Sequence, residues 1–386
     1  MEKYCIPDGF SFYGKNTGIK KTNKDLGIVI SDDICTAAAM FTKNKFCGES
    51  ITVGKEVIAN NHLQGIVVTS GVANVATGMQ GKENAIKIIN NIGNLFSIDP
   101  QNVLPSSTGI IGLQLPIEKI ISGINTLTIN SPGSVEDFAA AIMTTDTKLK
   151  IRTKKIGQSK ILGVAKGSGM IEPNMATMLV YIFTDAKISQ EKIYDCLKIS
   201  VEKSFNSISI DTDTSTSDTV VLMTSNHYPV EQEEFQKKLD SICMELAMDI
   251  LSDAEGATKI ISVEVKGCNK QEDSKILAKS IVNSPLVKTA VYGADPNWGR
   301  IIMALGKDES INFSKQDVQI QIGNSMIFSN ESCIVSPHEL KGISDYIRES
   351  KTVQIVVSVG KGIYSSKVFG CDLTEDYVRI NSLYST

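Results

Sequence analysis

The sequence predicts a mixed α/β (α+β) protein with more than one domain. A chain of 386 residues is longer than a single hydrophobic core usually supports, which favours two or three domains. In the first part of the chain, short apolar runs alternate with segments whose apolar residues recur at helical spacing. From about Gly267 the elements become shorter and alternate cleanly between apolar and polar residues. We therefore expect a main domain at residues 1–266 and a smaller α/β domain at residues 267–386.

Strands and helices can be assigned in order along the first 150 residues. Leu26–Ile30 and Ile66–Thr69 are apolar runs of strand length. Ile86–Ile92 and Ile117–Ile124 carry isoleucines at helical spacing, so both are predicted to be amphipathic helices. Ser134-Val135-Glu136-Asp137 resembles a capping box, which predicts a helix through Met143.

Two strands separated by a glycine-rich turn are predicted next. Ile161–Ala165 and Met178–Phe183 are the strands, and Lys166-Gly167-Ser168-Gly169 is the turn after the first of them. Ser189 is placed to cap a following helix, and a long helix runs from Phe235 to Ile250.

The last elements fall on either side of the expected domain boundary. The long helix should close near Gly256. Val318–Ile322 and Val353–Val357 are predicted strands of the smaller domain. The polar loop Asp211–Thr219 holds three aspartates, and we interpret it as a hydrogen-bonded turn.

Charge and cysteine usage narrow the class of protein. The 39 basic and 43 acidic residues are interleaved, giving a net charge of −4 and no basic patch for nucleic acid or an anionic membrane. No apolar run approaches the roughly 18 residues of a membrane span. The eight cysteines include no pair at metal-site spacing, so reduced thiols in a cytoplasmic protein are expected. A small-molecule enzyme without a metal fits these features.

The segment before Thr177 indicates self-cleavage chemistry. Glycine, proline and asparagine between Lys166 and Thr177 can hold a strained peptide bond. A threonine hydroxyl that attacks the preceding carbonyl would convert the amide into an ester, and hydrolysis would free the α-amine of Thr177. That amine, with an ordinary pKa of roughly 7.7–8.0, can serve as a base for the hydroxyl. Taken alone, the local pattern favours a glycine-rich hairpin that leads into a core strand, with Thr177 as an ordinary strand residue.

The stretch around Thr177 resembles the processing site of the ornithine acetyltransferase family, in which Asn-Met-Ala-Thr-Met-Leu is cut before the threonine. Here these residues are Asn174–Leu179. The segment Ser70–Gly78 differs from the family's usual sequence at Val72, Val75 and Ala76. Thr69, just before this segment, also differs from the usual residue. Other segments that match the family, in the same order, are Pro7–Phe10, Gly18–Lys21, Ala38–Thr42, Ser107–Gly112, Met143–Thr147, Asp213–Thr216, Glu255–Lys259, Tyr292–Ile301 and Asp376–Thr386.

The resemblance implies a fold, a processing step and a reaction. The fold is an αββα-like sandwich, related to self-processing aminopeptidases, plus a small C-terminal α/β domain. Cleavage between Ala176 and Thr177 yields chains 1–176 and 177–386, and two copies of each form a heterotetramer. The reaction is ping-pong transfer of acetyl from N-acetylornithine to glutamate in cyclic arginine biosynthesis, without a cofactor. Some members also use acetyl-CoA as a co-substrate, and no motif here decides that point.

The family's catalytic residues can be carried over position by position. Thr177 is the nucleophile, and Thr108 and Gly109 match the oxyanion hole. Lys166 suits the α-carboxylate that N-acetylornithine and glutamate share. Thr145 matches a substrate-binding threonine, although the neighbouring Thr144 could take that role.

The remaining carried-over residues lie in the last third of the chain. Glu255, which we place at a helix end, is expected to bind the side-chain ammonium of ornithine. Asn381 and Thr386 match substrate-binding positions, which implies that the C-terminal tail returns to the active site. The alternative function is that of a self-processing amidase or aminopeptidase-like hydrolase, in which water discharges the acyl-enzyme.

Overall fold

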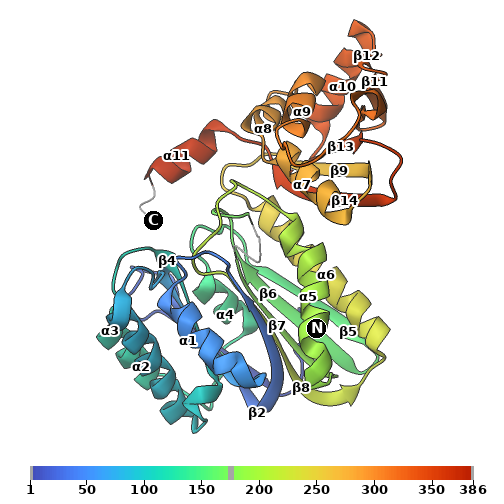
Figure 1. Ribbon diagram of the computed structural model, residues 1–386. Coiled ribbons are helices and arrows are strands. Elements are labelled where there is room, and N and C mark those ends of the chain that lie inside the picture. The colour runs from blue at the N-terminus through green and yellow to red at the C-terminus, as the bar shows by residue number, and fades with distance from the viewer. Residues whose placement is uncertain (1–2, 173–177, 384–386) are drawn as a thin grey trace. The chain divides into compact units, whose positions relative to one another are not determined.

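The computed structural model describes residues 3–172 and 178–383 (Figure 1). The chain forms two compact units. Within the described residues, the first unit holds the chain up to Asn206 together with Asp213–Ile250, and the second holds Ser207–Thr212 together with the chain from Leu251 onward. The predicted domain boundary after residue 266 lies inside strand β9 (Ile260–Cys268) of the second unit.

The sheet of the first unit depends on one long strand, β2 (Leu26–Phe41). Residues 26–31 of β2 pair with β1, whereas residues 36–41 pair with β8, so the sheet divides into two wings. One wing is β1-β2-β3-β4 and the other is β2-β8-β7-β6-β5. The other strands are β1 (Phe10–Lys15), β3 (His62–Val72), β4 (Val103–Ile110), β5 (Lys150–Ile156), β6 (Ser159–Lys166), β7 (Leu179–Lys187) and β8 (Thr219–Pro229).

The β2 strand is longer than the predicted Leu26–Ile30. The apolar run stops at Ser31, and the exposed Asp32 and Asp33 follow, which hides the strand from a pattern based on hydrophobicity. The pairing of β2 with β3 is irregular between Ile30 and Cys35, where these polar residues lie. Beyond this irregularity β2 continues and reaches the second wing.

Helices cover the outer face of each wing (Figure 1). Buried residues of α2 and α3 share a core with Ile28 and Val67 of the first wing. On the second wing, Gly163 leaves room for Ile242 and Leu246 of α6, because a Cβ atom there would lie 2.7 Å from the Leu246 side chain. The outer helices are α1 (Glu49–Val57), α2 (Gly78–Phe96), α3 (Ile117–Asn125), α5 (Gln190–Lys203) and α6 (Gln232–Ser252).

The inner faces of the two wings share one core with α4 (Val135–Ile142). Phe138 of α4 is fully buried, and its ring lies 6.0 Å from that of Phe12 and 5.6 Å from that of Tyr181. The layers are therefore helix, wing, wing and helix, with α4 packed between the wings. This arrangement agrees with the predicted mixed α/β fold and its αββα-like layering.

Several helix ends test the predictions from sequence. The capping box is confirmed, since the Ser134 and Asp137 side chains each accept a hydrogen bond from the other's backbone amide. Ser189 precedes α5 as predicted, but its side chain makes no capping hydrogen bond. The long helix α6 ends at Ser252.

Among the described residues, the second unit contains a six-stranded sheet in the order β12-β11-β10-β13-β9-β14, in which β13 and β9 run parallel and the other neighbours run antiparallel. The two predicted strands of this part of the chain are confirmed as β10 (Gln319–Ile322) and β13 (Thr352–Ser358). The remaining elements are β11 (Ser325–Ser329), β12 (Ser332–Cys333), β14 (Tyr364–Cys371), α7 (Gln271–Val282), α8 (Pro285–Tyr292), α9 (Trp298–Leu305), α10 (Pro337–Glu349) and α11 (Glu375–Leu383). Among the described residues, no helix is long and apolar enough to cross a membrane.

The central position of Phe138 leads to a stability prediction. Phe138→Ala should lower the free energy of unfolding by roughly 3–5 kcal/mol, because it removes a buried ring from the core shared by both wings. The matched control is Phe46→Ala, since Phe46 is 75% exposed and should cost far less. Urea denaturation followed by circular dichroism measures both variants. Similar losses in the two variants would contradict the assigned core.

Candidate active site

Thr108 and Gly109 lie near the end of β4, where this strand meets the end of β3. Thr108 pairs with Ser70, and Gly109 pairs with Gly71. Gly109 has a φ of +131°, and a Cβ atom at this position would lie 2.3 Å from the carbonyl carbon of Gly71. No side chain fits there, so Gly109 is required by the close approach of two backbones as well as by its φ angle.

A buried chain of hydrogen bonds lies directly behind Thr108. The Ser107 hydroxyl is 2.9 Å from that of Thr69 and 2.8 Å from that of Ser50, the second residue of α1. The side-chain amide of Asn74 donates to Ser50 at 3.4 Å. All four side chains are buried. Thr69 therefore takes part in a network that ties β3, β4 and α1 together beside the expected oxyanion hole.

The other residues that differ from the family's usual sequence, Val72, Val75 and Ala76, do not belong to this hydrogen-bond network. Val72 and Val75 are buried. Ala76 is exposed and has a φ of +56°, a left-handed conformation that costs a residue with a Cβ roughly 1–2 kcal/mol. The Asn74 side chain holds this segment, because it accepts from the Thr77 hydroxyl at 2.9 Å and donates to the Gly81 carbonyl at 3.0 Å.

The structure brings Lys166 together with the two threonines considered from the sequence. Lys166 ends β6 and pairs with Leu179 of β7, two residues after Thr177 in the chain. Its ammonium group donates to the Thr144 hydroxyl at 3.4 Å. The Thr145 hydroxyl lies 2.7 Å from that of Ser168, in the glycine-rich turn. Thr144 is therefore the threonine that is hydrogen-bonded to Lys166, whereas Thr145 is hydrogen-bonded to the glycine-rich turn.

Asp146 binds the backbone on both sides of this cluster. The sequence analysis did not identify it as a site residue. Its Oδ1 atom accepts from the Lys150 ammonium and the Gly167 amide, each at 2.6 Å, and its Oδ2 atom accepts from the Thr144 amide at 3.1 Å. Burial raises the pKa of Asp146, but Lys150 and Lys166 outweigh it, so the pKa lies below its usual value. The carboxylate therefore stays charged and holds Thr144 and the turn in place.

Lys20 is a second supporting residue that the sequence analysis did not identify. It was noted only as part of Gly18–Lys21, a segment that matches the family. Its aliphatic stem lies beside Gly71, since a Cβ atom at Gly71 would lie 3.4 Å from the Lys20 Cγ atom. Its ammonium group donates to the carbonyl of Met143 at 2.6 Å, immediately before Thr144. Burial lowers the pKa of Lys20 to about 8; Lys166 adds to this effect, while Asp25 and Asp146 oppose it.

Within the second unit, Glu255 and Asn381 are in contact. The Asn381 side-chain amide donates to the Glu255 carboxylate at 2.9 Å. The turn that carries Glu255 packs tightly on α11, because a Cβ atom at Gly256 would lie 2.4 Å from the Tyr377 nitrogen. The expectation that Glu255 ends a helix is wrong, as α6 already stops at Ser252. An unfavourable helix dipole therefore does not explain the presence of an acid here.

The predicted cleavage residues Ala176 and Thr177, and the terminal Thr386, lie outside the described residues. Glu172, the last described residue before them, is paired with the polar loop Asp211–Thr219. The Glu172 amide donates to the Asp213 carbonyl at 3.1 Å, and the Thr214 hydroxyl donates back to the Glu172 carbonyl at 3.1 Å. Over the described part of the chain, no cluster of three or more histidine, cysteine or acidic side chains could hold a metal ion.

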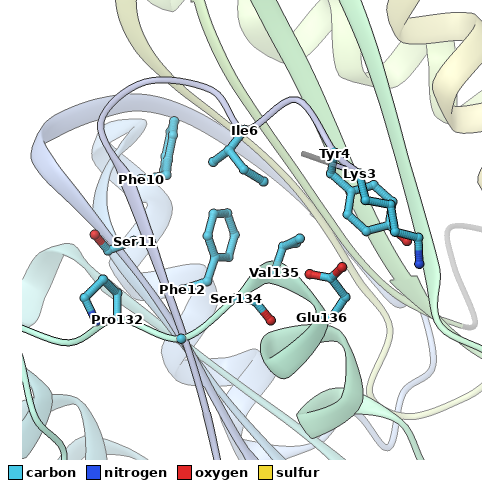
Figure 2. Close-up of a pocket in the computed structure, with 11 residues that line it drawn as sticks. Lys3, Tyr4, Ile6, Phe10, Ser11, Phe12, Pro132, Ser134, Val135 and Glu136 are labelled. Atoms are coloured by element: carbon cyan, nitrogen blue, oxygen red, sulfur yellow. The ribbon is translucent and has the colours of Figure 1, made fainter. Parts of the chain in front are cut away.

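A cavity of about 310 Å³ elsewhere in the first unit has a different character (Figure 2). Phe10, Phe12 and Val135 supply apolar walls, while Lys3 and Glu136 lie on one side. None of the predicted site residues that the structure describes lines this cavity. We therefore do not assign the reaction to it.

The layered fold, together with the comparisons with known proteins, identifies an acyltransferase. The chain belongs to the ArgJ family, which matches residues 11–386. It is 50% identical to the arginine biosynthesis bifunctional protein ArgJ 2 of Clostridium acetobutylicum, over 100% of this chain and 99% of that protein. It is 42% identical to ArgJ 2 of a Nostoc species, over 98% of each chain.

A solved structure gives the same family. The crystal structure of the arginine biosynthesis bifunctional protein argJ from Bacillus halodurans matches with a TM-score of 0.51 and 39% identity, covering 54% of this chain and 100% of that one. The family resemblance found in the sequence is thereby confirmed. So is the expectation of an acyltransferase of arginine biosynthesis.

The contact between Gly109 and Gly71 can be tested by substitution. Gly109→Ala should destabilise the protein by several kcal/mol, because the new Cβ atom would overlap the Gly71 backbone. Gly112→Ala is the matched control: Gly112 also has a positive φ, +85°, but its Cβ atom would meet nothing within 4 Å. That variant should lose only about 1–2 kcal/mol in urea denaturation. An equal loss at the two positions would mean that backbone conformation alone, and not the close approach, requires Gly109.

Proposed function

We propose that the protein transfers an acetyl group from N-acetylornithine to glutamate through an acetyl-enzyme on Thr177. The observation that carries the proposal is the cluster of Lys166, Thr144 and Thr145 beside the start of β7, the strand that follows Thr177. A cation and two hydroxyl groups suit a substrate with a carboxylate and an amide. The full-length identity to proteins named for arginine biosynthesis supports a reaction of that pathway.

In the first half-reaction, the Thr177 hydroxyl attacks the acetyl carbonyl carbon of N-acetylornithine, and the α-amine of Thr177 accepts the hydroxyl proton. Negative charge then develops on the carbonyl oxygen, where Thr108 and Gly109 donate hydrogen bonds. One such donor lowers the barrier by roughly 2.7–4 kcal/mol. The C–N bond breaks as the leaving nitrogen takes the proton, so ornithine departs and Thr177 keeps the acetyl group as an ester.

In the second half-reaction, the α-amine of glutamate attacks the ester carbonyl, and the same base receives its proton. The base then returns the proton to the Thr177 oxygen as the C–O bond breaks, so N-acetylglutamate leaves and the free threonine is restored. Lys166 binds the α-carboxylate that the two substrates share, and Thr145 contributes a hydroxyl. Glu255 binds the ornithine side-chain ammonium, and Asn381, its hydrogen-bond partner, moderates its charge toward the glutamate side chain.

The proposal includes the maturation of the chain. Cleavage between Ala176 and Thr177 frees the α-amine that serves as base, and the resulting chains assemble as two of each. We place the enzyme in the cytoplasm, consistent with eight unpaired cysteines. Acetyl-CoA is a further donor to be tested and not a bound cofactor.

Self-cleavage and donor use are tested first. Intact-mass analysis of purified protein should find fragments 1–176 and 177–386, whereas Thr177→Ala should remain whole and inactive. Glutamate should accelerate the consumption of N-acetylornithine with ping-pong kinetics, because one covalent intermediate links the two half-reactions. Uncut, fully active protein would contradict the mechanism. Donor hydrolysis that is indifferent to glutamate and ornithine would identify the hydrolase alternative.

The role of Glu255 separates the two half-reactions. Glu255→Gln should slow the reaction of N-acetylornithine by roughly 1.5–3 kcal/mol, because a hydrogen bond to a charged group is lost, and should affect the glutamate reaction less. Glu349→Gln, at an exposed position in α10, is the control for loss of an acidic charge. Single-turnover rates on fully processed protein measure each half-reaction. Equal losses in both would mean that Glu255 does not bind the ornithine ammonium.

A further inference from the structure

A single buried carboxylate immobilises the loop that carries Lys20. Asp25 is fully buried and accepts hydrogen bonds from five groups of residues 17–20. The Lys20 amide is one of them, at 2.9 Å. The backbone of Asp25 also continues into the site, since its carbonyl accepts from the Ser70 amide at 2.9 Å. The loop is therefore fixed on the end of β3, directly before Gly71.

From this loop, the Lys20 side chain reaches across to the other group of site residues. Its stem lies against Gly71, which packs backbone to backbone on Gly109. Its ammonium group donates to the carbonyls of Met143 and Lys24, at 2.6 and 3.1 Å. Met143 leads directly into Thr144, the neighbour of Lys166. Lys20 thus contacts the oxyanion side of the site with its stem and the carboxylate-binding side with its charge.

We propose that Lys20 is a positioning residue for acetyl transfer: its charged ammonium group holds the segment Met143–Thr145 in register with the turn of Gly71 and Gly109. The inference rests on the proposed function, because it concerns the spacing between the oxyanion donors and the group that binds the substrate carboxylate. Lys20 acts through these residues and takes no part in the bond changes. An error of about 1 Å in such spacing can cost roughly 100-fold in rate.

The charge of Lys20 is essential to this role. A hydrogen bond to a carbonyl is stronger when the donor is ionised. The charged groups that face Lys20 are Asp25 and Asp146, which favour the ammonium form, and Lys166, which opposes it. Because its pKa is lowered to about 8, Lys20 is charged at neutral pH and loses its proton as the pH rises through about 8. The positioning effect should therefore be complete below this pH and lost above it.

Three variants of the full-length, processed enzyme test the inference. Lys20→Met keeps the stem and removes the charge, Lys20→Arg keeps a charge that does not titrate, and Lys21→Met is the same substitution at the exposed neighbour. The kcat of acetyl-enzyme formation from N-acetylornithine should fall roughly 10- to 100-fold in Lys20→Met and should remain unchanged in Lys21→Met. Lys20→Arg should retain most of the activity at pH 7.

The pH profile distinguishes positioning by charge from simple packing. The wild-type rate should rise as the α-amine of Thr177 becomes a base and then fall above about pH 8, whereas Lys20→Arg should lack that fall. Equal activity of Lys20→Met and Lys21→Met would overturn the inference while leaving the proposed function intact. If Lys20→Met does not fold, identical alkaline profiles of the wild type and Lys20→Arg would also overturn it. A processed wild type without acetyl transfer would overturn both proposals.

Discussion

The arrangement of Lys166 and its threonine neighbours depends on the buried ion pair between Asp146 and Lys150. Both side chains are almost completely removed from solvent, and their charged atoms lie 2.6 Å apart. Breaking a buried pair by removing one partner typically costs 3–5 kcal/mol, because the other charge is left without compensation. The Asp146 carboxylate also accepts from the amides of Thr144 and Gly167, so a single charge connects β5, the segment after α4 and the turn after β6. The position of Lys166 and its threonine neighbours follows from this connection.

A second buried carboxylate, Asp25, has the same role on the other side of the site. It holds the loop of residues 17–20 by its side chain and the start of the Ser70–Gly71 segment by its backbone. Lys20 connects the two systems, because it rests on Gly71 and donates to Met143. The cation is kept in a partly desolvated position by two backbone carbonyls and by the acids around it. Lys20 thereby holds the backbone at Met143 and the backbone at Gly71 at a fixed separation. No sequence motif marks these backbone groups.

The second unit supplies a separate polar cluster with its own supports. Thr374 donates to the Gly256 carbonyl at 2.6 Å, and the close approach of Gly256 to the Tyr377 backbone fixes the start of α11 against the turn of Glu255. Near the C-terminal end of α11, the Asn381 side-chain amide donates a hydrogen bond to the Glu255 carboxylate. Two residues that the family resemblance named independently, 126 positions apart, are therefore direct partners. The contact gives a physical reason for an acid at a position where no helix dipole acts.

Features that depend on neighbours along the chain can be predicted from the sequence alone. Helical spacing, the Ser134 capping box and the alternating strands of the second unit are local patterns, and the structure has them where they were expected. The ordered motifs around Thr177, Thr108 and Lys166 were sufficient to identify the family. The length of β2 and the absence of a side-chain cap at Ser189 became known from the three-dimensional structure. The structure also showed the supporting roles of Lys20, Asp25, Asp146 and Ser107. The supporting roles depend on partners brought together by the fold or on desolvation, and neither is encoded in the spacing of residues along a sequence.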